Sequence, residues 1–78
     1  MSNVMTQPDV LVFKTNIRNK KDSKKITPLM DAETRIKSWS VDHEDSAKVL
    51  RVESRQIKPS EIIDLIKQAG YACEELTD

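Results

Sequence analysis

An apolar run at residues 10–13 that continues through Thr15 to Ile17 is the pattern of a β-strand. Leu11, Phe13 and Thr15 share one side of this strand, and we expect that side to point inward. A shorter segment predicts a last strand at residues 71–76.

Two further alternating segments cover residues 36–42 and 49–54. Trp39 and Val41 fall on one face of the first, so we expect the tryptophan to lie in the core or at its half-buried edge. Because only the short polar connector 43–47 separates the two segments, the sequence predicts an antiparallel hairpin.

A helix is predicted between the first strand and this hairpin. Asn19 is a good N-cap residue, and Asp22 follows three positions later, where its carboxylate can accept bonds from free N–H groups at the positive end of the helix dipole. Apolar residues then recur at helical spacing, interrupted by one proline: Ile26, Pro28, Leu29 and Met30.

A second helix is predicted between Pro59 and Gly70. Proline suits the first position of a helix, and glycine suits the position just after its end. The expected buried stripe of this helix consists of Ile62, Ile63, Ile66 and Ala69.

The order strand, helix, strand, strand, helix, strand predicts an α+β domain of the ferredoxin-like type, βαββαβ. Such a domain has a four-stranded antiparallel sheet with two helices on one face. We expect this domain to cover residues 9–78, and residues 1–8 to form a flexible leader. Three loops should meet at one end of the molecule and bring together Asn19, Asp22, His43 and Tyr71.

Composition narrows the functional classes. Thirteen basic and thirteen acidic residues give a formal net charge of zero, so the chain has no overall positive field for nucleic acid. No segment has the length of a membrane span or the pattern of a secretory signal, which makes the cytoplasm the expected location. The pattern shows neither a nucleophile–base pair nor paired catalytic acids, so we expect no enzymatic activity.

The single cysteine, Cys73, cannot form an intramolecular disulfide. Nothing beside it in the sequence indicates an activated thiolate, because the neighbouring Glu74 and Glu75 should raise its pKa. We expect it to be structural or unused.

Residues 14–28 read Lys-Thr-Asn-Ile-Arg-Asn-Lys-Lys-Asp-Ser-Lys-Lys-Ile-Thr-Pro, and residues 70–71 read Gly-Tyr. With these segments the chain resembles the heavy-metal-associated domains of copper chaperones and metal-pumping ATPases, whose members include the pattern Lys-Thr-Asn-Ile-x-Cys-x-x-Cys before a Thr-Pro. The resemblance implies a divergent member, because Asn19 and Asp22 stand where that pattern has cysteines. It also implies that the first helix continues past Pro28 to about Asp31.

The missing cysteines change the expected chemistry. Two thiolates suit Cu(I) or Zn(II), whereas an amide and a carboxylate are harder donors and too few for Ca(II). We therefore expect no cofactor, and we interpret Asn19 and Asp22 first as helix-capping residues. A different metal ion, held by Asp22 and His43, or a small anion at the Asn19–Asp22 loop is the alternative.

Basic residues gather around the predicted start of the first helix, where cations are locally unfavourable. The cluster consists of Arg18, Lys20, Lys21, Lys24 and Lys25. The acidic hairpin residues Asp42, Glu44 and Asp45 could neutralise it within the chain, an acidic partner could dock on it, or an anion could bind at the helix start.

These observations favour a non-enzymatic, metal-free interaction or regulatory module. The resemblance implies a partner such as an intact heavy-metal-associated domain, since members of that family use lysines around the metal loop to meet partner domains. RNA binding ranks last, because the open face of the sheet would need aromatic residues and both Phe13 and Trp39 are expected to point inward.

Overall fold

The computed structural model describes residues 9–76. The expected leader, residues 1–8, and the last two residues, 77–78, lie outside the described part of the chain. The elements follow the predicted order: β1 (Asp9–Thr15), α1 (Lys20–Ala32), β2 (Ile36–Asp42), β3 (Val49–Ser54), α2 (Pro59–Gln68) and β4 (Cys73–Glu75).

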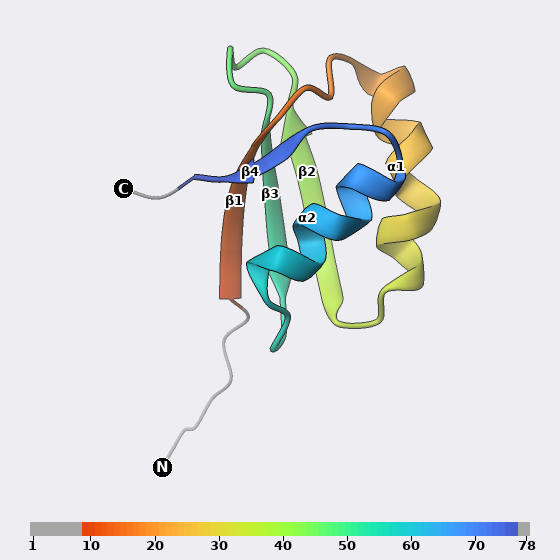
Figure 1. Cartoon of the computed structure of the whole chain (residues 1–78), viewed down its shortest axis with the longest axis vertical. Helices are drawn as coiled ribbons and strands as arrows, with labels where there is room; N and C mark the ends of the chain where they lie inside the picture. The colour runs from red at the N-terminus through yellow and green to blue at the C-terminus, as the bar shows by residue number, and fades with distance from the viewer. Residues whose placement is uncertain (1–8, 77–78) are drawn as a thin grey trace.

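The four strands form one antiparallel sheet in the order β2-β3-β1-β4. Both helices pack on the same face of this sheet, α1 beside the β2 side and α2 across the middle (Figure 1). This is the ferredoxin-like fold that the sequence predicts. Neither helix is long and apolar enough to span a membrane, as far as residues 9–76 are concerned.

The core lies between the sheet and the two helices, and cross-strand pairs establish its register. Phe13 of β1 lies opposite Leu50 of β3, which in turn lies opposite Val41 of β2. Phe13 and Leu50 are fully buried, whereas Val41 and Trp39 are half-buried and pack against the core. The predicted inward faces are therefore correct, and Phe13 and Trp39 lie on the helix side of the sheet rather than on its open face.

The helices contribute the other half of the core. Ile26 and Met30 of α1 are buried, as are Ile62 and Ile66 of α2. The remaining members of the predicted stripes are only half-buried: Leu29, Ile63 and Ala69. Helix α1 continues through Pro28 to Ala32, close to the end that the family resemblance implies.

Two strands are shorter than predicted. Strand β1 ends at Thr15 rather than residue 17, because the Thr15 N–H donates to the Ala47 carbonyl at 3.0 Å and its hydroxyl donates to the Lys48 carbonyl at 2.6 Å. The same hydroxyl accepts from the Ile17 N–H at 3.2 Å, so Ile17 reaches the core from a turn. Strand β4 begins only at Cys73.

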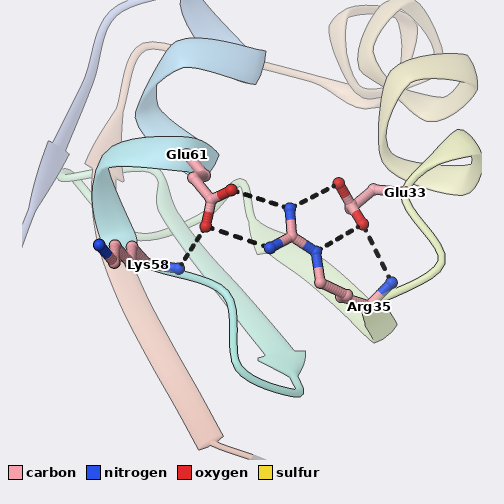
Figure 2. Close-up of polar contacts among 4 residues, drawn as sticks. All are labelled: Glu33, Arg35, Lys58 and Glu61. Carbon is pink, nitrogen blue, oxygen red and sulfur yellow. Dashed lines mark hydrogen bonds and ion pairs between the residues drawn. The ribbon is translucent and has the colours of Figure 1, made fainter.

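An ion-pair network connects the α1–β2 turn to the start of α2 (Figure 2). The Arg35 guanidinium lies between two carboxylates: Nε donates to Glu33 at 2.9 Å, and Nη2 donates to Glu61 at 2.9 Å. A second oxygen of Glu61 accepts from the Lys58 N–H at 2.8 Å. The Arg35 hydrogen bonds lower the pKa of Glu33 to about 2 and also lower that of Glu61.

We expect this network to make the thermal stability of the fold fall at acidic pH, and the variant Arg35→Met to reduce that fall. A carboxyl whose pKa is lower in the folded chain stabilises the fold above its unfolded pKa, and the contribution disappears as the pH falls through the folded pKa. For Glu33 this window runs from 4.5 down to about 2. Arg35→Met should lower Tm at neutral pH by a few degrees and flatten the fall of Tm across this window.

Circular-dichroism melts at several pH values measure this effect. Arg51→Met, which removes an exposed arginine of β3, is the matched control and should follow the native curve. Parallel pH profiles for the native chain and Arg35→Met would contradict the assignment.

Candidate functional site

Three loops meet at the end of the molecule opposite the Arg35 network: the β1–α1 loop, the β2–β3 connector and the α2–β4 loop (Figure 1). The Ala72 N–H donates to Asn16 Oδ1 at 2.8 Å, which joins the first loop to the third. His43 Nε2 lies 2.8 Å from Ser23 Oγ, which joins the connector to α1. We call the surface formed by these loops and the first turns of α1 the rim.

Asn19 forms the helix cap that the sequence predicts. Its backbone is extended, and its side-chain oxygen Oδ1 accepts from the Asp22 N–H at 3.0 Å. This arrangement satisfies one of the free N–H groups at the helix start, so the Asn19 oxygen is engaged within the protein.

Asp22 uses both of its carboxylate oxygens. Oδ1 accepts from the Tyr71 hydroxyl at 2.9 Å, and Oδ2 accepts from the Arg18 N–H at 3.1 Å. The Tyr71 hydrogen bond, the Arg18 N–H and the nearby charge of Lys25 lower the pKa of Asp22. Burial and the Asp22 carboxylate in turn raise the pKa of Tyr71, so at neutral pH a charged acceptor faces a neutral donor.

His43 approaches α1 through Ser23 rather than through Asp22. Its carbonyl accepts from Lys48 Nζ at 2.6 Å, which fixes the connector from the other side. Within residues 9–76, no three or more histidine, cysteine, aspartate or glutamate side chains are grouped closely enough to hold a metal ion. The structure thus brings all four predicted rim residues to one end without assembling a metal-ligand set from them.

The basic cluster is exposed along the first two turns of α1 and the residue before its cap. In the described part of the chain, the ion pairs within 4.0 Å all involve Arg35, so no member of this cluster has a direct acidic partner there. Two of the hairpin acids instead stabilise the turn between β2 and β3: Asp42 accepts from the Glu44 N–H and Asp45 accepts from the Ala47 N–H. Direct neutralisation of the cluster by these acids is therefore not realised.

A shallow polar cavity of about 410 Å³ opens between the β1–α1 and α2–β4 loops. Arg18 and Lys25 line it together with Asp22 and Tyr71. The Asp22 carboxylate already occupies the positive end of α1, which disfavours a small anion at the same helix start.

Cys73 starts β4 directly after Ala72, makes none of the rim contacts described above, and has only 9% of its surface exposed. Burial raises the pKa of its thiol to about 11, while Lys67 opposes this shift. The predicted direction is confirmed, but the cause is burial rather than the adjacent glutamates. For Glu74 alternation along β4 explains this, since that residue belongs to the opposite face of the sheet from Cys73.

No protein-family profile and no curated protein sequence matches this chain. Solved structures do match. The copper(I)-loaded first domain of the human copper chaperone for SOD1 has a TM-score of 0.74 at 14% identity, covering 91% of this chain and 94% of that domain. The N-terminal domain of PacS from Synechocystis PCC6803 has a TM-score of 0.72 at 16% identity, covering 88% and 98%.

The yeast copper transporter domain CCC2A, solved in apo and Cu(I)-loaded states, has a TM-score of 0.71 at 14% identity and covers 88% of this chain and 96% of that domain. The chain has the fold of heavy-metal-associated domains. At these identities the likeness concerns the fold, so the chemistry has to be argued from the residues of this chain.

The residues of the β1–α1 loop do not fit a soft metal ion on this fold. Asn19 and Asp22 offer oxygen donors, whereas Cu(I) prefers sulfur ligands. These oxygens also accept internal hydrogen bonds, which a metal would have to displace. We therefore derive no metal-transfer step for this chain.

Three side-chain contacts between the rim segments were not predicted from the sequence. The Tyr71 hydroxyl donates to Asp22, the Asn16 side-chain oxygen accepts from the Ala72 N–H, and the Ser23 hydroxyl lies within hydrogen-bond distance of the His43 ring. The topology places these loops together, but the sequence contains no signal for which side chains reach across. A tyrosine after the glycine that ends α2 was the single clue to the first contact.

Proposed function

We propose that this chain is a metal-free, non-enzymatic protein-interaction module that docks through the basic cluster at the rim. One observation carries this proposal: five exposed cations lie beside a loop whose own polar groups are engaged internally. Exposed cations that form no direct ion pair within residues 9–76 lose little on meeting an acidic surface, and they steer association over a Debye length.

The partner that fits this surface is a folded domain with an acidic face, such as an intact heavy-metal-associated domain in the same cytoplasm. Solved relatives in fold include a domain of a copper chaperone and a domain of a copper transporter, which supports this choice of partner. Binding without metal would make the chain a regulator or competitor of metal-carrying domains.

Charge reversal tests the docking surface. The double variant Lys24→Glu/Lys25→Glu should bind a purified, metal-free heavy-metal-associated domain of the source organism about tenfold more weakly than the native chain, because two attractive contacts become repulsive. NMR titration of the isotope-labelled chain measures the affinity, and the native shifts should map to residues 18–25. Lys37→Glu/Arg55→Glu carries the same charge change on exposed positions away from the rim and should leave the affinity nearly unchanged.

Separate titrations with Cu(I), Zn(II) and inorganic phosphate test the alternative of a metal or anion carrier. Saturable shifts at Asp22 or His43 with any of these ligands would contradict the metal-free proposal. Equal weakening by the two charge-reversal variants would contradict docking at the rim.

A further inference from the structure

The Asp22–Tyr71 contact connects two rim segments that are 49 residues apart in the sequence. Tyr71 is held on its own side by several features. Gly70 has a φ of 92°, a conformation that glycine adopts readily, and it turns the chain out of α2. The Tyr71 N–H then donates to the Ile66 carbonyl at 3.2 Å, and the Tyr71 ring packs against the core.

Asp22 is equally constrained on the side of α1. It lies in the first turn, where its N–H is held by Asn19, and its second oxygen holds the Arg18 N–H. Removing the Tyr71 hydroxyl would therefore release one of the two donors that position this carboxylate. Arg18 lies in the β1–α1 loop and its N–H bonds to Asp22, so its placement depends on how the two loops are held, and Lys25 of α1 lines the same cavity.

We infer that Asp22 and Tyr71 are positioning residues for the docking surface: their contact holds the β1–α1 and α2–β4 loops, without any metal, in the arrangement that presents Arg18 and Lys25. This inference rests on the proposed function, because it names what keeps the docking surface in one shape. A surface held in this way loses little conformational freedom on binding, so it suits a folded, rigid acidic partner.

The Asn16–Ala72 bond joins the same two loops and limits the effect of losing the Tyr71 hydroxyl. For this reason we expect the loops to loosen locally in Tyr71→Phe and the fold to remain intact. The phenylalanine keeps the ring that packs on the core and removes only the donor.

Amide hydrogen exchange measured by NMR tests the inference without any partner. In Tyr71→Phe, exchange of the Arg18 amide should accelerate about tenfold, whereas the core amides of Val52 and Ile66 should keep their native rates. Ser23→Ala is the matched control, because it removes a rim hydroxyl that contacts His43 and leaves the Asp22–Tyr71 contact in place. Unchanged exchange at Arg18 in Tyr71→Phe would overturn the inference.

Binding to the same metal-free heavy-metal-associated domain tests the link to docking. Tyr71→Phe should weaken binding several-fold with an unchanged salt dependence, because it removes no charge, whereas Lys24→Glu/Lys25→Glu should reduce the salt dependence. In Asp22→Ala, which removes the acceptor, the further change Tyr71→Phe should have little additional effect, as expected for two partners of one contact.

The outcomes separate the two proposals. Faster exchange with native affinity in Tyr71→Phe would overturn the positioning role and leave rim docking intact. Faster exchange in Tyr71→Phe, together with a native chain that binds no acidic domain, would instead overturn the docking function, and with it the role of this contact in docking.

Discussion

The double variant Asn19→Cys/Asp22→Cys is expected to bind Cu(I) at the β1–α1 loop, where the native chain has no thiol. The Asp22 N–H already donates to the Asn19 side chain at 3.0 Å, so the Asn19 side chain reaches the backbone of Asp22, and side chains three positions apart at a helix start are neighbours. Thiolates are preferred ligands of Cu(I), and a helix N-terminus lowers thiol pKa values. Competition against a coloured Cu(I) chelator should show a change from no binding at this loop to a stoichiometric complex.

The pair Asn19→Ser/Asp22→Ser is the matched control. Serine suits a helix cap and occupies nearly the volume of cysteine, but it supplies no thiolate, so this variant should bind no Cu(I) at the loop. Each single cysteine variant should bind far more weakly than the double variant. A double variant that binds no more Cu(I) than the serine pair would show that loop geometry, rather than donor type, excludes the metal.

This result would separate what the fold supplies from what the residues supply. The double variant also loses the Asp22 acceptor for Tyr71, so metal binding would have to hold the loop by different bonds. A gain of binding despite that loss would mean that the native chain shares the metal-binding framework and differs at the donor atoms. Fold likeness alone cannot make this distinction.

The periodicity of the sequence was sufficient for most of the fold. Alternation placed Phe13 on the inner face, and helical spacing identified Ile62 and Ile66 as core residues. These predictions succeed because burial of one face repeats every two residues in a strand and every three to four in a helix. The cap at Asn19 could be predicted from the sequence as well, since it depends only on residues within one helical turn.

Contacts between distant side chains were beyond this kind of reasoning. Arg35 reaches Glu61 across 26 positions, and Tyr71 reaches Asp22 across 49. Periodicity tells which face or loop a residue belongs to, whereas these contacts depend on how far each loop turns and in which direction the side chain extends. The early end of β1 has the same origin, because Thr15 bonds to the connector that follows β2.

Cys73 should react with thiol reagents about a hundredfold more slowly than an ordinary protein thiol in the folded chain. Its thiol has a pKa of about 11, raised by burial from 9.0, and only the thiolate attacks such reagents. Because the residue is also nine-tenths buried, access should slow the reaction further. The rate of colour formation with an aromatic disulfide at pH 7.5 measures this effect, first in buffer and then in denaturing urea.

Unfolding supplies one control and the variant Asn19→Cys supplies another. In urea Cys73 should react at the rate of a free thiol, and in folded Asn19→Cys the exposed thiol at the helix start should react fast while Cys73 stays slow. Biphasic kinetics in that variant would identify each thiol by its own rate. Fast reaction of Cys73 in the folded native chain would contradict its burial and would make it a candidate sulfur ligand for a metal ion. Slow reaction would exclude Cys73 as such a ligand.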